Sequence, residues 1–440
     1  MSKSPIATQP DVPAFVVPAA NLVPVSDYPA HMAEIPPSRM FLIREALGTY
    51  KARFGREALT YDASQGDGGA SLPGVPAEVL QRALALQLEH GSAYDQPFGT
   101  AQFRKAATEL YWKLDPATGW TENNIVFTQG GRDGLQKAYA AMMHLGAQES
   151  GAAIIVSRVP WISYNWGPYG IGLNVMLAPG HAEQAWAYTP ESIRACVDYA
   201  KAEGRKVAGI VITSPDNPTG RIATLEEQAE LAHAALDAGI PFVLFDWMYH
   251  WITESGPYDL NALLNLFAPA ERERLIIIDG LTKSLGASNI RAAQMVAGKQ
   301  VIKFVISQAS HGVIPSYFAQ AVAISAYEMG FENAARTIIE PTNRSRAVLQ
   351  TALTDAGLEF ISGGGYYAFI NCGEFIRAGG LPDSEGLLKY LGAEFGLAIV
   401  PGVYFSGAAA DWIRFSYALD PQLTAGACKQ LVAGLNALKS

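Results

Sequence analysis

Residues 275–283, LIIIDGLTK, join a continuous apolar run to a group of polar residues. Leu275 and the three isoleucines after it have the length and composition of a strand that is buried on both faces. Asp279 follows this run directly, and Thr282 and Lys283 come shortly after it. We therefore expect a buried strand that ends in polar residues.

Similar apolar runs precede this one, with helical stretches between them. They lie at residues 125–128, 153–156, 207–213 and 242–246. Continuous Val, Ile and Leu runs that alternate with helices indicate a parallel sheet inside an α/β domain. One of the helices is predicted at residues 100–114, where an apolar stripe recurs at helical spacing: Phe103, Ala106, Ala107, Leu110, Tyr111 and Leu114.

The chain ends have a different pattern. After about residue 330 we expect a long helix at residues 331–356, strands at 366–371 and 412–417, and helices at 387–395 and at the C-terminus. Residues 38–60 repeat helically and should pack with this part. We therefore predict a large domain at residues 61–325 and a small α+β domain made of 38–60 and 326–440. Residues 1–37 are Pro-rich and are expected to be a disordered tail or, slightly favoured, an N-terminal arm that lies on a partner subunit.

The composition restricts the class of protein. The chain has 440 residues, with 32 Lys and Arg against 41 Asp and Glu, which gives a net charge of −9. This acidic balance argues against nucleic acid as a partner. No apolar run has the length of a membrane span, and the three widely separated cysteines favour neither a disulfide framework nor a metal site. We expect a soluble, cytoplasmic protein without a metal.

Polar side chains follow four of the predicted strands. Thr128 precedes a Gly130-Gly131 turn, and Thr213 precedes SPDNPTG at residues 214–220. The strand that ends at residue 246 delivers Asp246, and the strand at 275–278 leads to Lys283. Because ligands of parallel α/β sheets bind beyond the carboxyl ends of the strands, these groups should meet at one site.

The chemistry of these residues points to an aldehyde cofactor that carries a phosphate. The amine of Lys283 can form a Schiff base with an aldehyde. Asp246 can keep a pyridine nitrogen protonated, which makes the ring an electron sink. The Gly130-Gly131 turn before a helix is an anion site in principle, and Arg291 offers a second cation for the same phosphate. A lone Gly-Gly turn is more often an ordinary connection, so the combination carries the prediction.

In these segments the chain resembles the class I/II aminotransferases, which are fold-type I pyridoxal-phosphate enzymes of the aspartate aminotransferase-like kind. The resemblance runs from about residue 38 to the C-terminus. It rests on motifs in the order and at the spacing of the family: Tyr94-x-x-Pro97-x-Gly99, Phe103-Arg104, SPDNPTG at 214–220, Asp246-x-x-Tyr249, Thr282-Lys283 with Arg291, Pro401-Gly402 and Arg414-Phe-Ser. It implies a large cofactor-binding domain, whose mostly parallel sheet is flanked by helices, and a smaller α+β domain from both chain ends.

The resemblance also implies roles in cofactor binding. Lys283 would hold pyridoxal 5'-phosphate as a Schiff base and then move a proton at the substrate Cα. Asp246 would pair with the ring nitrogen, and Trp161 would stack on the ring. Tyr249 and Asn217 would hydrogen-bond the ring oxygen. The phosphate would be bound by Gly130, Gly131, Arg132, Thr282 and Arg291.

Two further roles follow from the resemblance. Tyr94 would reach the phosphate of the neighbouring subunit, which implies a homodimer with shared active sites. Arg414 would bind the substrate α-carboxylate as a fork, a task that Lys performs poorly, and the backbone at Gly66 would close over the same carboxylate. Asn217 would contact the substrate as well.

Several positions depart from the family pattern. Gly280 stands where the family often has Ser or Thr, and Ala293 stands where it often has Gly. Enzymes for dicarboxylic substrates carry a second arginine at a place where this chain has Ile306, and no arginine lies between Arg291 and Arg336. We therefore expect an apolar or aromatic donor, with aromatic residues near the motifs that include Tyr164, Trp166, Trp247, Trp251, His311 and Tyr366.

The predicted activity is transfer of the amino group of an L-α-amino acid to a 2-oxo acid. The same residues also serve β-lyases, cyclases and oxygen-dependent oxidases, because the bond that breaks at Cα depends on its alignment with the ring. A ligand sensor in a transcription regulator would carry a winged helix-turn-helix, but few and Pro-rich residues precede this fold. A nicotinamide dehydrogenase would need a glycine fingerprint that this chain lacks.

Overall fold

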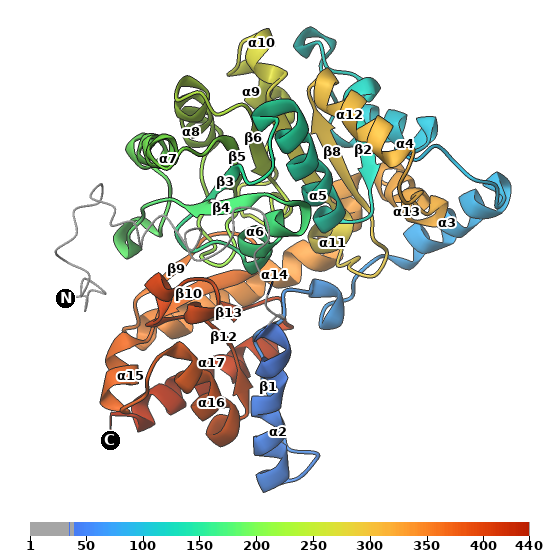
Figure 1. Cartoon of the computed structure of the whole chain (residues 1–440). Helices are drawn as coiled ribbons and strands as arrows, with labels where there is room; N and C mark the ends of the chain where they lie inside the picture. The colour runs from blue at the N-terminus through green and yellow to red at the C-terminus, as the bar shows by residue number, and fades with distance from the viewer. Residues whose placement is uncertain (1–34, 36–38, 440) are drawn as a thin grey trace.

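The computed structural model describes Ile35 and residues 39–439, apart from the side chain of Phe41. The predicted N-terminal arm, residues 1–37, therefore lies outside the described residues except for Ile35. Figure 1 shows two parts, one above the other. The upper part contains a large sheet with helices on both faces, and the lower part contains a separate antiparallel sheet.

The large sheet has seven strands in the order β2-β8-β7-β6-β5-β3-β4. The five predicted apolar runs form β2 (Ile125–Thr128), β3 (Ala153–Val156), β5 (Val207–Thr213), β6 (Val243–Asp246) and β7 (Leu275–Gly280). The sequence did not predict β4 (Asn174–Leu177) or β8 (Ala293–Ala297). All pairs from β7 to β4 are parallel, whereas β8 runs antiparallel to both β2 and β7. The carboxyl ends of β2, β5, β6 and β7 therefore meet at one edge of the sheet.

Different helices cover the two faces of this sheet. One face packs against α5 (Gly131–Ala141) and α12 (Lys299–Ala309), and it receives Ile276 and Ile278 of β7. The opposite face receives Leu275 and Ile277, because successive side chains of a strand alternate. This face is covered by α3 (Ala77–His90), α4 (Ala101–Ala106), α7 (Pro190–Ala202), α8 (Leu225–Asp237), α9 (Leu260–Asn265) and α13 (Tyr317–Glu328).

The helix predicted at residues 100–114 differs in detail. It begins after Thr100, whose hydroxyl accepts a hydrogen bond from the Phe103 amide, and α4 ends at Ala106. The chain then continues as a wider π-helical segment, Ala107–Tyr111. This wider turn shifts the apolar stripe, so Phe103 and Tyr111 are buried while Leu110 is 41% exposed. Leu110, which the helical spacing places in the apolar stripe, is therefore not part of the buried core.

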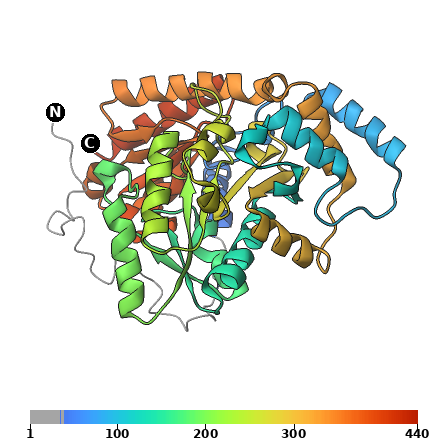
Figure 2. The ribbon, with the colours of Figure 1, turned by 90° about the horizontal axis from the view of Figure 1, so that it is seen from above.

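The lower part combines both ends of the chain. Its sheet has the order β12-β13-β10-β9, with β9 (Phe360–Ser362), β10 (Tyr367–Asn371), β12 (Val400–Pro401) and β13 (Trp412–Ser416). Around it lie α14 (Phe331–Asp355), α15 (Gly373–Ala378), α16 (Ser384–Phe395) and α17 (Pro421–Ala437). Seen from above, α14 runs along one side of the molecule (Figure 2). Helix α2 (Ile43–Phe54) packs on α16 so closely that a Cβ at Gly392 would lie 2.4 Å from that of Ala46.

Two features are absent from the described residues. No helix there is both long and apolar enough to cross a membrane. No group of three or more His, Cys, Asp or Glu side chains in the same residues is arranged to hold a metal ion.

Candidate active site

A cavity of about 460 Å³ lies at the carboxyl edge of the large sheet. Tyr164, Thr213, Met248 and Ser288 contribute to its lining. The other lining residues include most of those that the sequence singled out: Gly131, Arg132, Trp161, Asn217, Asp246, Tyr249, Thr282, Lys283 and Arg291. An amine, a carboxylate, two phenols and two guanidinium groups therefore line one cavity.

Lys283 lies on the short helix α11 (Leu281–Ser284), which continues directly from β7. Its Nζ donates a hydrogen bond to the carbonyl oxygen of Gly66 and lies 5.8 Å from the centre of the Tyr249 ring. Burial is the largest effect on the Lys283 amine and lowers its pKa, and the nearby Arg414 acts in the same direction. A lowered pKa raises the fraction of neutral amine, which is the nucleophilic form.

Asp246 ends β6 and points to the same face of the sheet as Ile278, its partner in register. Its Oδ2 accepts a hydrogen bond of 2.5 Å from the Tyr164 phenol, and its Oδ1 accepts one of 3.0 Å from the Met248 amide. Burial raises the pKa of Asp246 to about 6, while these two hydrogen bonds oppose the rise. The carboxylate is thus held in one orientation, with its charge available near neutral pH.

A candidate anion site lies where α5 begins. The guanidinium of Arg291 donates to the carbonyl oxygens of Ser288 at 2.8 Å and Gln129 at 3.2 Å. It lies so close to Gly130 that a Cβ there would be 2.3 Å from Nη2 of Arg291, and Gly130 also has a φ of +87° that suits glycine. Helix α5 begins at Gly131, next to this guanidinium, and helix N-termini favour anions.

Two more groups complete the anion site. Arg132 lies over the Trp161 ring at 5.4 Å, and burial together with the neighbouring Arg291 lowers its pKa. The Thr282 hydroxyl is buried and makes no hydrogen bond to any described residue. Two cations, a helix N-terminus and an unpartnered hydroxyl suit a phosphate group, so the residues present fit the cofactor that the sequence predicts.

Arg414 is a buried cation on β13, in the lower part of the molecule. Its Nη1 donates to the Asn217 side-chain oxygen and its Nη2 to the Ser64 carbonyl, both at 2.9 Å. The guanidinium lies 4.0 Å from the centre of the Tyr367 ring, and its Nε has no hydrogen-bond partner in the described chain. Within residues 39–439 no carboxylate pairs with Arg414, so a carboxylate ligand would supply the missing charge.

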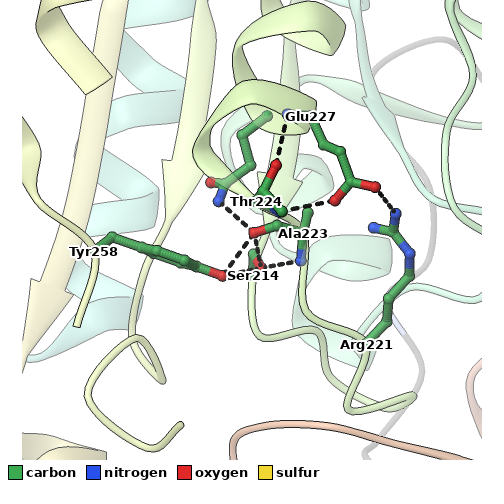
Figure 3. Close-up of polar contacts among 7 residues, drawn as sticks. Ser214, Arg221, Ala223, Thr224, Glu227 and Tyr258 are labelled. Carbon is green, nitrogen blue, oxygen red and sulfur yellow. Dashed lines mark hydrogen bonds and ion pairs between the residues drawn. The ribbon is translucent and has the colours of Figure 1, made fainter. Parts of the chain in front are cut away.

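The loop that carries Asn217 is fixed at its far end by hydrogen bonds that Figure 3 shows. Ser214 Oγ accepts from the Ala223 amide at 2.8 Å, and the Tyr258 phenol donates to the Ala223 carbonyl at 2.9 Å. Helix α8 then starts with a capping box, in which the side chains of Thr224 and Glu227 bond each other's backbone amides. The loop therefore has defined ends on either side of Asn217.

Gly66 and Tyr249 lie at a meeting point of three chain segments. A Cβ at Gly66 would lie 2.1 Å from the phenol oxygen of Tyr367. The Tyr249 phenol lies 2.8 Å from the same oxygen, and burial raises the pKa of Tyr249 well above its usual value. Tyr367 therefore contacts Gly66, Tyr249 and Arg414, although sequence reasoning missed it. The strand predicted at residues 366–371 was a signal for it, because Tyr366 and Tyr367 are consecutive there and only one of them can face the same side as Arg414.

Some predicted residues lie elsewhere. Tyr94 is 92% exposed and does not line the cavity. Among the aromatic residues predicted near the pocket, Tyr164 lines this cavity and Trp166 lines a second cavity of about 390 Å³ beside it. The others take different places: Trp247 and Trp251 pack on the opposite face of the sheet, Tyr366 bonds the Lys283 carbonyl, and His311 is exposed.

Comparisons with known proteins point to one family. The family model described as aminotransferase class I and II matches residues 62–431. An aspartate aminotransferase of Bacillus subtilis is 24% identical over 81% of this chain and 87% of its own length. An aspartate/prephenate aminotransferase of Thermus thermophilus is 26% identical over 78% of this chain and 82% of its own length. Among solved structures, a double mutant of Thermus thermophilus aspartate aminotransferase shares the fold, with a TM-score of 0.76 at 22% identity over 91% of this chain and 97% of that one.

Proposed function

Because the chain belongs to the class I and II aminotransferase family, a family of pyridoxal-phosphate enzymes, we propose that it moves the amino group of an L-α-amino acid to a 2-oxo acid. The observation that carries this proposal is the shared cavity of Lys283 and Asp246. Asn217 lines the same cavity and holds the buried Arg414 beside it. The amine, the carboxylate and the carboxylate-binding arginine are the three groups that such a reaction needs.

The proposed cofactor is pyridoxal 5'-phosphate, held by residues of this chain. Arg291, Arg132, the Thr282 hydroxyl and the amides of Gly130 and Gly131 would bind its phosphate. Asp246 would pair with the ring nitrogen, Trp161 would cover the ring, and Tyr249 and Asn217 would bond its ring oxygen. When bound, the cofactor supplies an aldehyde for amine exchange and a ring that accepts electrons from the substrate Cα.

The residues of the chain divide the remaining work. Burial lowers the pKa of the Lys283 amine. This amine would take a proton from the substrate Cα and deliver it to the carbon of the cofactor aldehyde. The ionised Asp246 keeps the ring nitrogen protonated, with the Tyr164 bond holding its carboxylate in place. Arg414 binds the substrate α-carboxylate through its fork, and the backbone at Gly66 closes over the same carboxylate.

We propose that the amino donor has an apolar or aromatic side chain, which would lie in the second cavity. That cavity adjoins the first, because Arg132 and Leu135 line both. Its lining is largely apolar and aromatic: Leu135, Ile162, Trp166 and Tyr404. An acidic donor is a second candidate, because relatives of this chain are named aspartate aminotransferases.

A single-turnover experiment tests the proposed function. Purified protein loaded with the cofactor is mixed with phenylalanine, leucine or aspartate in the absence of a 2-oxo acid. We expect the absorbance of the aldehyde form to disappear while one equivalent of 2-oxo acid forms, with phenylalanine or leucine faster than aspartate. The alternatives have different products: a β-lyase releases ammonia, an oxidase consumes oxygen, and a cyclase gives a ring-closed product. Those outcomes would replace transamination, and a faster reaction with aspartate would select the acidic donor.

We further propose a homodimer with shared active sites. Tyr94 is 92% exposed, and apolar side chains on and near α3 are exposed as well, among them Leu84, Leu88 and Val313. A second copy that covers this surface would bring Tyr94 to a neighbouring phosphate site. Sedimentation velocity should give a dimer. We also propose domain boundaries at residues 61 and 326 and a cytoplasmic location.

A further inference from the structure

The side chains of the loop after β6, residues 247–251, lie on two sides of the sheet. Met248 and Tyr249 line the cofactor cavity. Trp247, His250 and Trp251 instead pack with the aromatic residues of the opposite side. The position of Tyr249 in the cavity therefore depends on what holds its neighbours on the far side.

The far side holds a buried polar group that the proposed reaction does not use. The Tyr111 phenol donates a hydrogen bond to Oδ2 of Asp279 and accepts one of 2.6 Å from the Trp251 indole N–H. Nε2 of His250 lies 3.2 Å from the phenol oxygen of Tyr111 and 3.4 Å from Oδ2 of Asp279. Asp279 and His250 are each 1% exposed. Trp112 and Trp247 lie nearly parallel to the imidazole, at 5.7 and 5.6 Å.

Burying such a polar group lowers the stability of the folded protein. A buried carboxylate costs free energy unless hydrogen bonds and charges compensate it. Here Oδ1 of Asp279 and Nδ1 of His250 have no hydrogen-bond partner among the described residues. Apolar side chains of similar size would fill the same space at lower cost. A contribution to stability alone does not account for the group.

The group of Asp279, Tyr111 and His250 lies next to two residues of the active site in the sequence. Asp279 lies on β7, four residues before Lys283, and His250 follows Tyr249 directly. A backbone hydrogen bond of 2.9 Å from Trp247 to Ile278 already joins the two strand ends. The Asp279–Tyr111–His250 group extends that connection to the next residues of both segments. The charge of Asp279 also acts on Asp246 in the neighbouring strand, where it adds to the rise in pKa.

We propose that Asp279, with Tyr111 and His250, forms a positioning group that fixes Lys283 relative to Tyr249 across the cavity. Asp279 ties the segment that leads to the amine, and His250 ties the loop that carries the phenol. The group touches neither substrate nor cofactor and acts only through these two residues. This inference rests on the proposed function of Lys283.

Two variants remove the contacts in different ways. Tyr111→Phe loses the phenol oxygen and keeps the ring, and His250→Phe loses the imidazole nitrogens and keeps the aromatic packing. Asp279→Asn is the conservative variant, because its amide oxygen can still accept from Tyr111. Ser325→Ala is the matched control: the Ser325 hydroxyl is buried on the same face and, within the described chain, bonds only the Ala321 carbonyl, at 2.7 Å.

The measurements follow the bound cofactor as well as turnover. In both Phe variants we expect the pH midpoint of the absorbance change of the bound cofactor to move by about half a pH unit or more. We expect kcat to fall by about tenfold or more, with the KM of the amino donor little changed, because small misplacements of reacting groups are costly. Asp279→Asn should stay close to wild type in kcat, because it keeps the acceptor for Tyr111, and Ser325→Ala should differ only in melting temperature.

The outcomes separate this inference from the proposed function. If wild-type protein binds no cofactor, the proposed function fails first. If wild type binds it and both Phe variants, folded by near-ultraviolet circular dichroism, keep the wild-type midpoint and kcat, the positioning role is contradicted. If neither variant folds, the group is a folding element and the proposal is also overturned.

Discussion

The phenol of Tyr164 donates a hydrogen bond of 2.5 Å to Oδ2 of Asp246. The donor comes from α6 (Ile162–Trp166) and the acceptor from the end of β6, so the bond joins a helix to a strand end. It lowers the pKa of the Asp246 carboxyl, against the burial that raises this pKa to about 6. Tyr164 therefore helps to keep Asp246 ionised in a place that favours the neutral acid.

Replacing Tyr164 with Phe should shift the pH dependence of activity. Without the donor, the pKa of Asp246 rises further, and a neutral Asp246 cannot hold a protonated ring nitrogen. We expect the acidic limb of the kcat/KM profile to move to higher pH by about one unit, the value of one hydrogen bond to a charged group. Thr213→Val is the control and should keep the wild-type acidic limb. Among the described residues, the Thr213 hydroxyl bonds only the Tyr164 oxygen, at 3.1 Å, and does not bond Asp246. An unchanged acidic limb in Tyr164→Phe would contradict the role of this bond.

The ionised carboxylate of Asp246 should lower the free energy of unfolding of the cofactor-free protein. Its pKa in the folded state, about 6, lies above the usual 3.8, so the folded state takes up a proton as the pH falls through this range. The ionised form is thus unfavourable above pH 6, and the cost disappears below pH 4. We expect cofactor-free Asp246→Asn to be more stable than wild type at pH 8, by up to about 3 kcal/mol.

Urea unfolding of the cofactor-free proteins at several pH values checks this expectation. The difference in the free energy of unfolding between Asp246→Asn and wild type should decrease steadily as the pH falls from 6 to 4. An exposed acid variant, Glu109→Gln, should show no such difference. A gap that stays constant with pH, or a less stable Asp246→Asn, would show that the carboxylate is not strained by burial.

Gly130 and Gly172 form a matched pair for the anion site. Both have positive φ, +87° and +84°, so alanine should strain each backbone by a similar amount. A Cβ at Gly172 meets nothing within 4 Å, whereas one at Gly130 meets the Arg291 guanidinium. We expect the Kd for pyridoxal 5'-phosphate to rise about tenfold in Gly130→Ala and to stay near wild type in Gly172→Ala, by fluorescence titration. Equal affinities in the two variants would place the phosphate elsewhere.

Arg414 should determine the affinity for the amino donor. Arg414→Lys removes the fork and keeps a charge, so we expect the KM of the donor to rise about 10- to 100-fold, with a smaller loss of kcat. Arg346→Lys is the comparison, since Arg346 is equally buried but bonds Tyr417 and the Ile252 carbonyl. That variant should lose melting temperature and keep KM. An unchanged KM in Arg414→Lys would remove Arg414 from the substrate site.

The sequence predicted the strand ends well, because polar residues after apolar runs mark the carboxyl edge of a parallel sheet. Thr213, Asp246 and Lys283 were found in this way, and they line one cavity. Strands β4 and β8 were missed for a physical reason. Residues 174–177 and 293–297 lack the branched runs of the other strands, and they are strands because their neighbours in the sheet pair with them.

Contacts between distant segments could not be predicted from local patterns. Tyr367 meets Gly66 only because the two parts of the molecule pack together there and a glycine leaves room for the phenol. The pairing of Asp279 with Tyr111 and His250 likewise depends on three separate segments. Trp247 and Trp251 were predicted near the pocket, but the loop turns them to the opposite face, since neighbouring side chains of this loop point to different sides.

The most direct measurement is a peptide map of protein that has been incubated with pyridoxal 5'-phosphate and reduced with borohydride. We predict a single reduced pyridoxyl adduct on Lys283, and its loss in Lys283→Ala. Lys137, which pairs with Asp133, provides the control Lys137→Ala, which should keep the adduct. An adduct on a different lysine, or no adduct in wild-type protein, would contradict the assignment of Lys283.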